Sequence, residues 1–247
     1  GFVILYRYHF LYQMDNNHQK MKIAIIIPVY NEAQVIKKTL LDLKKYFKTK
    51  KLKNIDLVVV DDGSIDNSGQ LALTHANYLL THKKNCGLGA ALATGIEFAK
   101  RNNYDFCVTF DSDGQHDPKD IGTALKKLAN YDIVIGSRFI GTHSNMPKSR
   151  RLILFVSNLI TWLFFGVWTT DSQSGFRGLN KKAIQTIRLK SNRMEVSSEF
   201  FGEIKRLSLK FSEIPIHVRY TKYSLSKGQK NINSANVLVK LLYMLSR

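Results

Sequence analysis

From Met21 onward the chain alternates short, almost wholly apolar segments with longer amphipathic ones, and this order restricts the folds that it can adopt. Short apolar runs between turn residues are typical of strands buried on both faces, and their alternation with helices favours a parallel sheet covered by helices. We therefore predict an α/β fold with a mostly parallel central sheet. The strands are predicted at 23–27, 57–60, 78–81, 106–110 and 133–135, and the helices at about 32–47, 68–75, 88–101 and 118–130.

The second half of the chain is less regular, and it contains no internal repeat. Its predicted elements are an apolar helix at 152–168, helices at 181–187 and 195–207, a strand at 213–220 and a closing helix from 234. The 247 residues contain no linker-like tract, so we expect one domain over 21–230, followed by a C-terminal helix over 231–247.

Residues 1–20 fit no part of this pattern and lack a signal-peptide cleavage site. We expect them to be an N-terminal extension that is not native or is disordered, with Met14 or Met21 as the natural start.

The net charge of +18 favours an anionic partner, such as nucleic acid, anionic lipid or a phosphorylated substrate, without choosing among them. Lys148, Arg150 and Arg151 directly precede the apolar run 152–168. That run is too short for the ~30 Å hydrocarbon core of a membrane. It is therefore either a buried helix or a helix that lies in the membrane interface.

Two features exclude other classes of protein. Cys86 and Cys107 have neither CxxC spacing nor histidine partners, which excludes a zinc ribbon, and we expect both to be core residues in a reducing cytoplasm. The segment 85–92 opens a helix with Gly87 and Gly89, but it lacks the third glycine of a dinucleotide fingerprint and the Lys-Ser/Thr of a phosphate loop. A Rossmann dehydrogenase and a P-loop NTPase are both disfavoured.

Polar clusters follow four of the predicted strands, at 28–32, 61–66, 111–117 and 136–138. Because the carboxyl ends of parallel strands meet at one edge of a sheet, these clusters should converge there. A stacking ring, several acceptors, paired carboxylates and an arginine are the parts that a nucleotide diphosphate needs.

Asp111 and Asp113 stand one residue apart after the strand 106–110. Side chains two apart on an extended segment point the same way, so both carboxylates can face one Mg²⁺ or Mn²⁺, and Gln115 can add a carbonyl oxygen. Asp117 is expected to cap the next helix. An isolated Asp-x-Asp pair is a weak signal, since acidic pairs at strand ends are most often solvated turn residues.

Six motifs in order resemble the family-2 glycosyltransferases of the GT-A fold, and most closely their polyprenyl-phosphate branch, the dolichyl-phosphate mannosyltransferase type. The resemblance covers about 21–230. The motifs are Pro28-Val-Tyr30-Asn31-Glu32, Asp61-Asp62-Gly63-Ser64-Ile-Asp66, Asn85-Cys-Gly87-Leu-Gly89-Ala90, Asp111-Ser-Asp113-Gly-Gln115-His116, Gly136-Ser137-Arg138 and Asp171-Ser-Gln-Ser-Gly175-Phe176-Arg177.

The resemblance implies three groups of site residues. The donor is expected to bind at Pro28, Tyr30, Glu32, Asp61, Asp62, Gly87, Asp111 and Lys227. A Mg²⁺ or Mn²⁺ on the donor diphosphate is expected at Asp111, Asp113 and Gln115. An acceptor phosphate is expected at Arg138, with Arg150 or Arg151.

Glycosyl transfer also needs a nucleophile at the anomeric carbon. A sugar hydroxyl requires a carboxylate base, whereas a lipid phosphate is already an anion and needs only positioning by cations. Asp171 is the first candidate to orient or activate the acceptor, and Glu199 is the second. Asp171 can equally be a cap or an ion pair with Arg177, and Arg177 can stabilise charge on the phosphates.

One segment departs from the dolichyl-type pattern of an arginine followed by Gly-x-Ser-Lys. The corresponding residues, 221–227, keep Lys227 but lack the arginine and the glycine. The resemblance therefore implies neither the cationic group that binds the donor phosphate nor a GDP-mannose donor. The sequence of residues 223–229 resembles more closely that of bacterial enzymes of cell-envelope assembly.

The leading hypothesis is an inverting, metal-dependent enzyme that moves a sugar from a nucleotide-diphosphate sugar to a polyprenyl phosphate or lipid-linked glycan in bacterial cell-envelope synthesis. It is expected at the cytoplasmic face of the membrane, with a small membrane protein as a further partner and no nucleic acid. The alternatives are transfer to a saccharide hydroxyl, a basic nucleic-acid-binding protein, and a membrane-surface scaffold with an inactive transferase fold.

Overall fold

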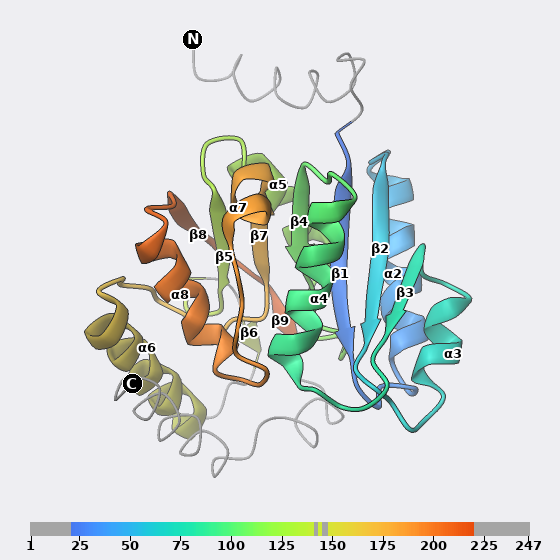
Figure 1. The fold of residues 1–247 in the computed structure, drawn as a ribbon, viewed down its shortest axis with the longest axis horizontal. Coiled ribbons are helices and arrows are strands. Elements are labelled where there is room, and N and C mark those ends of the chain that lie inside the picture. The colour runs from blue at the N-terminus through green and yellow to red at the C-terminus, as the bar shows by residue number, and fades with distance from the viewer. Residues whose placement is uncertain (1–20, 141–142, 145–147, 220–247) are drawn as a thin grey trace.

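The computed structural model describes residues 21–140, 143–144 and 148–219, which form three layers with a sheet between two sets of helices (Figure 1). The sheet has seven strands in the order β3-β2-β1-β4-β7-β5-β8. Their bounds are β1 Ile23–Val29, β2 Ile55–Asp61, β3 Tyr78–Thr81, β4 Phe106–Thr109, β5 Ile133–Ser137, β7 Arg177–Asn180 and β8 Phe211–Pro215. Only β7 runs antiparallel to its neighbours, so the predicted α/β class with a mostly parallel sheet is confirmed.

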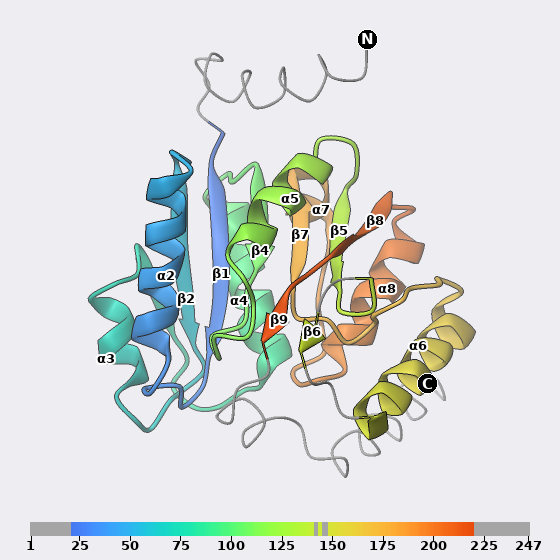
Figure 2. The same cartoon turned by 180° about the vertical axis from the view of Figure 1, so that it is seen from behind.

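Helices cover both faces of the sheet. On the face seen in Figure 1 lie α4, Leu88–Arg101, α7, Lys181–Thr186, and α8, Val196–Arg206. On the opposite face, seen in Figure 2, lie α2, Ile36–Thr49, and α5, Lys119–Lys127, with α3, Ser68–Leu73, beside α2. The helix α6, Lys148–Phe165, lies at one end of the molecule, where it packs against α8. Among the described helices, none has the length and apolar character that a membrane crossing requires.

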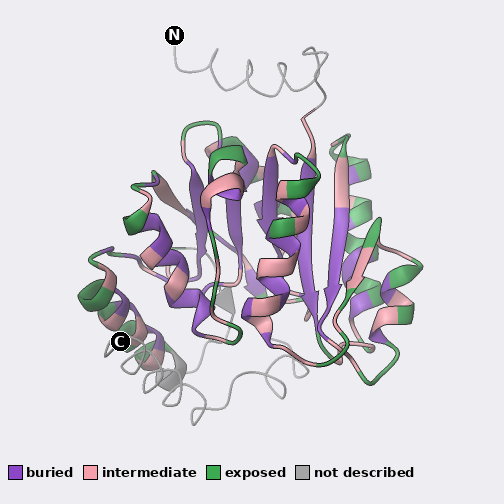
Figure 3. Ribbon diagram, in the orientation of Figure 1, coloured by how far each residue is buried: buried purple, intermediate pink, exposed green. Residues whose placement is uncertain are grey.

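The sheet is the buried centre of the molecule, as the purple strands of Figure 3 show. Every residue of β1 is buried, and its side chains alternate between two core clusters. Ile23, Ile25 and Ile27 join the cluster under α2 and α5, whereas Ala24 and Ile26 join the cluster under α4 and α8. This is the period-two alternation of a strand covered on both faces, and it explains why the strand reads as one apolar run.

Two short strands were absent from the sequence prediction. The strand β7 carries Arg-Gly-Leu-Asn, which has no apolar run, and its place is set by pairing with β4 and β5. The strand β6, His143–Ser144, pairs with β9, Val218–Arg219, in a separate two-stranded sheet. The strand predicted at 213–220 was wrong in extent, because the chain leaves the large sheet after Pro215.

Some predictions fall on residues that the structure does not describe. These are the extension 1–20, the end of the domain at 230 and the helix from 234. In the described part, α5 begins at Lys119, one residue later than predicted. The carboxylate of Asp117 accepts a hydrogen bond from the Lys119 amide at 3.0 Å, so it satisfies a free amide of the first turn as expected.

Close packing of α4 on β1 depends on a glycine inside the helix. A Cβ atom at Gly95 would lie 2.3 Å from Cγ2 of Ile26 in the middle of β1. Glycine in a helix is normally unfavourable by about 1 kcal/mol relative to alanine. Here the absence of a side chain lets the helix and the strand approach each other.

We therefore expect Gly95→Ala to lower the free energy of unfolding by about 1–3 kcal/mol, since a methyl group would overpack the α4–β1 contact. Urea denaturation of both proteins measures the change. The matched control is Gly122→Ala in α5, where the new methyl would meet only the hydroxyl tip of the Tyr46 side chain. This control should be neutral or more stable by up to about 1 kcal/mol. Equal stability of the two variants would contradict the prediction.

Candidate active site

The strands β1, β2, β4 and β5 all run in the same direction, so the predicted polar clusters meet at one edge of the sheet, the lower edge in Figure 1. At this edge the segment after β1 is tied to the segment after β2. The amide of Asn31, which has a φ of 54°, donates to Ser64 Oγ at 3.0 Å, and the Glu32 amide donates to Ser68 Oγ at 2.7 Å.

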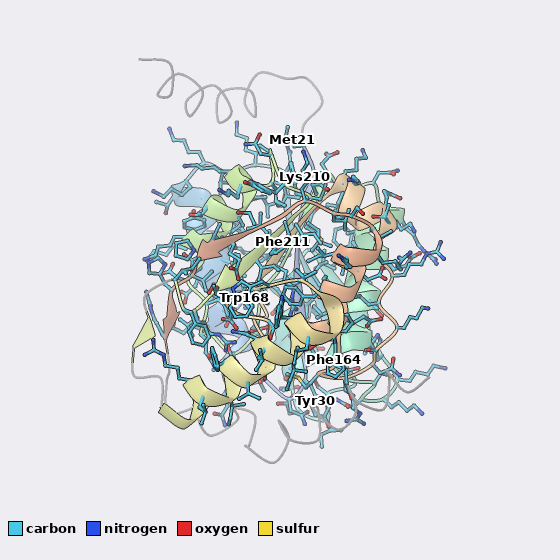
Figure 4. All side chains as sticks on the ribbon, turned by 90° about the vertical axis from the view of Figure 1, so that its left-hand side faces the viewer. Met21, Tyr30, Phe164, Trp168, Lys210 and Phe211 are labelled. Atoms are coloured by element: carbon cyan, nitrogen blue, oxygen red, sulfur yellow. The ribbon has the colours of Figure 1, made fainter. Side chains whose placement is uncertain are left out.

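Tyr30 presents its ring at this edge, with 43% of its surface exposed. Figure 4 shows Tyr30 at the same end of the molecule as Phe164 of α6, and Met21 at the opposite end. The neighbouring Pro28 is buried in β1. The amides of the two residues that follow Tyr30 already have hydrogen-bond partners. The exposed ring of Tyr30 is suited to stacking on a ligand.

Asp61, the last residue of β2, and Asp62, which follows it, have different surroundings. The carboxylate of Asp61 accepts a hydrogen bond from the Ser64 amide at 3.0 Å. The carboxylate of Asp62 accepts from the amides of Cys86 at 2.9 Å and Gly87 at 2.7 Å, and it also bonds to the ring of His82 at 2.7 Å. Asp62 is therefore an anchor that holds the glycine segment to the end of β2.

The glycine segment needs its glycines for close contact rather than for a dinucleotide. Gly87 has a φ of +104°, and a Cβ there would lie 2.4 Å from the carbonyl oxygen of Asn192. The same carbonyl accepts a hydrogen bond from the amide of Ala90 at 3.1 Å. The loop before α8 thus packs directly on the start of α4, which only a residue without a side chain permits.

The acidic pair after β4 is gathered by a turn, and the prediction of an extended segment was wrong. The strand ends at Thr109, and Gly114 has a φ of +74° inside the turn that follows. Asp113 accepts from the amide of Gln115 at 3.0 Å and from its side-chain amide at 2.7 Å. The turn folds the Asp113 carboxylate back toward Asp111. The two side chains are therefore not brought together by the alternation along an extended strand.

His116 was given no role by the sequence, although it stands at the end of the same motif. Its Nε2 bonds to a carboxylate oxygen of Asp111 at 3.0 Å, and its ring stacks on Phe176 with centroids 5.7 Å apart. Its buried Nδ1 has no hydrogen-bond partner in the described part of the chain. The only sequence signal was its position directly after Gln115.

The charges of this turn act on one another. Burial by itself would raise the pKa of Asp111, but the hydrogen bond and charge of His116, with the charges of Arg177 and Arg138, hold that pKa below its usual range. Burial and the negative charge of Asp111 together raise the pKa of Asp113 to about 6. The pKa of His116 is raised because the contact with Asp111 outweighs the effect of burial. Burial and the mutual repulsion of the two carboxylates therefore oppose ionisation of Asp113, whereas the neighbouring cations favour ionisation of Asp111.

Asp171 and Arg138 form a buried ion pair at the same edge. The amide of Arg138 donates to the Asp171 carboxylate at 3.0 Å, its Nε donates to the same oxygen at 2.7 Å, and its Nη2 donates to the other oxygen at 2.6 Å. Asp171 is wholly buried and Arg138 is 9% exposed. The alternative prediction, an ion pair between Asp171 and Arg177, was wrong. The arginine that bonds to both oxygens of Asp171 is Arg138.

The loop that carries Asp171 is held from α6. The side chain of Asn158 donates to the carbonyl of Thr170 at 2.6 Å and accepts from the amide of Ser172 at 2.8 Å. These two residues flank Asp171 on either side. Asn158 thus fixes the loop at the ion pair and joins it to the helix, a role that its place in an apolar run did not reveal.

Arg177 begins β7 and is buried, with 1% of its surface exposed. Its guanidinium lies over the ring of Phe200 at 4.5 Å, and none of its three nitrogens has a hydrogen-bond partner among the described residues. Burial lowers the pKa of Arg177 to about 10, against the opposing charges of Asp111 and Asp171. Arg177 is therefore a buried cation whose charge acts on both aspartates.

The remaining predicted site residues are Glu199, Arg150, Arg151 and Lys227. Both oxygens of Glu199 accept from backbone amides, those of Lys190 at 2.7 Å and Ser191 at 2.9 Å, so its catalytic role stays a prediction. Arg151 lies exposed on α6. The side chain of Arg150 and the whole of Lys227 lie outside the part of the chain that the structure describes.

The chain is similar to several known proteins, two of which are named by their activity. It is 42% identical over 233 residues to an uncharacterized protein of Methanocaldococcus jannaschii, a match that covers 92% of this chain and 93% of the relative. It is 31% identical to the UDP-N-acetylglucosamine–dolichyl-phosphate N-acetylglucosaminyltransferase of Methanococcus voltae, over 90% of this chain and 95% of that enzyme. It is also 31% identical to the undecaprenyl-phosphate mannosyltransferase of Micrococcus luteus, over 79% of this chain and 83% of that enzyme.

The fold matches that of glucosyl-3-phosphoglycerate synthase from Mycobacterium tuberculosis, solved with Mn²⁺, uridine diphosphate and glucosyl-3-phosphoglycerate. The TM-score is 0.65 at 14% sequence identity, and the match covers 92% of this chain and 80% of that one. The family model described as glycosyl transferase family 2 matches residues 24–188, which is more than half of the chain. The chain therefore belongs to glycosyl transferase family 2 and is a glycosyltransferase.

Proposed function

We propose that this enzyme transfers a sugar, with inversion, from a nucleotide-diphosphate sugar to a polyprenyl phosphate at a membrane surface. The observation that carries the proposal is the Arg138–Asp171 ion pair at the edge of the sheet that also bears the acidic turn. The loop of this pair is bonded to α6, whose outer face is apolar and exposed. The activities named for the relatives from Methanococcus voltae and Micrococcus luteus support the same acceptor class.

The donor is assigned to the loops after β1 and β2. Tyr30 offers an exposed ring for a base, and the carboxylates of Glu32 and Asp61 offer acceptors for the amino and hydroxyl groups of a nucleoside. Asp62 contributes indirectly, because it fixes the amides of Cys86 and Gly87. Lys227 stays a proposal from the family resemblance alone.

The residues of the acidic turn fit a divalent cation. Two carboxylates and an amide, all oxygen ligands without a thiol, suit Mg²⁺ or Mn²⁺. Burial and the charge of Asp111 raise the pKa of Asp113, so a cation beside both carboxylates would favour the ionised form of Asp113. We assign the ion to Asp111, Asp113 and Gln115, where it would neutralise charge on the leaving diphosphate. The protein contributes the positive charge of Arg177, which favours the ionised form of Asp111, and His116, which bonds to one of its oxygens.

The acceptor phosphate is assigned to Arg138. An oxygen of the phosphate attacks the anomeric carbon while the bond from that carbon to the donor diphosphate breaks, which inverts the configuration. A phosphate oxygen is already anionic, so no base is needed. Asp171 then serves to orient the guanidinium of Arg138, since both of its oxygens already accept from that group. Arg150 and Arg151 would add positive charge at the start of α6.

The membrane contact is assigned to α6. Apolar residues along it are exposed, including Leu152, Phe155, Leu159, Trp162, Leu163 and Phe164, and Trp168 follows the helix. A helix with an apolar outer face and a basic first turn is suited to lie in the interface of an anionic bilayer. Asn158 joins this helix to the loop of Asp171, so a membrane bound at α6 would lie next to the loop that holds the Arg138–Asp171 pair.

The finer setting remains a proposal. We place the enzyme at the cytoplasmic face of the membrane, where nucleotide sugars are available, with a small membrane protein as a further partner. A role in bacterial cell-envelope synthesis rests on the sequence resemblance, whereas the similar relatives come from both archaea and bacteria.

Asp113→Asn should remove the metal-dependent part of donor binding, because it takes one anionic ligand from the ion. A donor at a hundred times its Kd adds about 2.7 kcal/mol to the free energy of unfolding. Thermal denaturation with UDP-, GDP-, dTDP- and CDP-sugars, in Mn²⁺ and in chelator, measures this. The matched control Asp42→Asn lies on the exposed side of α2 and should keep the full effect. If Mn²⁺ and donor stabilise Asp113→Asn as much as the unaltered protein, the assignment of the ion to Asp111, Asp113 and Gln115 is wrong.

Asp171→Asn distinguishes the two kinds of acceptor. With a lipid phosphate, the variant should lose about 10- to 100-fold in kcat/KM, since Arg138 is less well held but no proton has to be removed. Steady-state kinetics with a short-chain polyprenyl phosphate, alongside a thermal denaturation curve, make the measurement. A loss of several orders of magnitude with unchanged acceptor binding would instead indicate a base and a hydroxyl acceptor.

Leu163→Glu should weaken membrane binding about tenfold or more, because burial of one leucine contributes about 1.5–3 kcal/mol. Sedimentation with vesicles of phosphatidylglycerol and phosphatidylcholine measures the bound fraction. Leu73→Glu is the matched control, since Leu73 on α3 is 58% exposed and Leu163 is 64% exposed. Equal losses in both variants would mean that added negative charge, rather than α6, explains the effect.

A further inference from the structure

We propose that Asp62, His82 and Cys86 form a second metal site, for a thiophilic ion such as Zn²⁺. One ligand atom from each residue lies within 4.8 Å of the other two, and this is the one such trio of His, Cys, Asp or Glu side chains in the described part of the chain. The sequence prediction that both cysteines are core residues was wrong for Cys86, which is partly exposed, and the loop after β3 brings His82 within 4.8 Å of it.

The three side chains come from different elements of the same edge. Asp62 follows β2, His82 follows β3, and Cys86 stands two residues before α4. A thiolate, an imidazole and a carboxylate form a ligand set typical of Zn²⁺, and three protein ligands leave a fourth position for water. Asp62 is almost wholly buried, whereas His82 and Cys86 are partly exposed, so an ion could enter from solvent.

The ring of His82 is already oriented for a ligand. Its Nδ1 lies 2.7 Å from the carboxylate of Asp62, and its Nε2 lies 2.9 Å from the hydroxyl of Thr94. With its proton on Nε2, His82 donates to Thr94 and frees the Nδ1 lone pair. Metal-binding histidines are usually fixed in this way by a partner on the second nitrogen.

Binding also has a definite proton balance. On binding, the ring proton of His82 moves through solvent from Nδ1, where it bonds to Asp62, to Nε2, where it bonds to Thr94, so the imidazole stays neutral. Nδ1 and the Asp62 oxygen, now 2.7 Å apart, separate to admit an ion with bonds of about 2.0–2.2 Å to each. The thiol of Cys86 exchanges its proton for the ion and gives up its contact of 3.4 Å with the carbonyl of Lys84.

This site differs from the acidic turn in both chemistry and position. The acidic turn offers oxygen atoms, which suit hard cations, whereas the Asp62–His82–Cys86 trio adds a sulfur and a nitrogen. Asp62 also holds the amide of Gly87 at 2.7 Å. An ion on the trio would therefore fix the glycine segment that packs against the loop before α8.

Co²⁺ as the probe for the zinc site gives a sharp test, because a cobalt–thiolate bond produces a charge-transfer absorption band that oxygen and nitrogen ligands do not. The chain has only two cysteines, and Cys107 is fully buried, which raises the pKa of its thiol. We expect one equivalent of Co²⁺ to give the band in the full chain and in Cys107→Ala. Cys86→Ala should lose the band completely, with an unchanged thermal denaturation curve.

Two further variants locate the ion. Thr94→Val removes the partner of Nε2 and should weaken Co²⁺ binding about 10- to 100-fold, measured by competition with a chelator. Asp113→Asn leaves the band intact, which separates this site from the proposed donor metal. The proposal is overturned if the full chain shows no thiolate band with Co²⁺, if the band survives in Cys86→Ala, or if it disappears in Asp113→Asn.

Discussion

Burial of β1, β2 and β4 on both faces is the constraint on which the rest of the molecule depends. Strands covered by helices on two sides must be apolar throughout, so their backbone and side chains carry no chemistry of their own. Polar residues can appear only where the strands end. Since these strands are parallel, their ends coincide, and the acidic turn, the Asp61–Asp62 segment and the ring of Tyr30 are brought to one edge.

The charges at that edge are held by other buried charges. Asp171 is bound by Arg138 through both oxygens, and the charge of Arg177, whose guanidinium has no hydrogen-bond partner among the described residues, acts on Asp111 and Asp171. Removing one member of such a buried pair typically costs about 3–5 kcal/mol, because the other is left uncompensated. This arrangement fixes the positions of the charged groups before any ligand arrives, and such preorganisation is what the binding of a charged ligand requires.

Three polar residues link the surrounding segments to this edge of the sheet by hydrogen bonds. Asp62 holds the glycine segment, Asn158 holds the loop of Asp171 to α6, and Asp120 holds the chain after β8 by bonding to both the amide and the ring of His217. Each is a buried or nearly buried polar residue with partners far away in the sequence. Such residues are easily mistaken for ligand-binding groups, because both roles need a polar side chain with little exposure.

The sequence by itself determined the alternation of strands and helices, the common edge and the identity of the motifs, because hydrophobic periodicity and short motifs are local properties of the chain. The tertiary structure alone decided which polar groups meet. It paired Asp171 with Arg138 instead of Arg177, folded Asp113 back in a turn, placed β7 between β4 and β5 without an apolar run, and set His82 beside Cys86. These contacts join residues that are distant in the chain or turn on backbone geometry, so no local pattern could specify them.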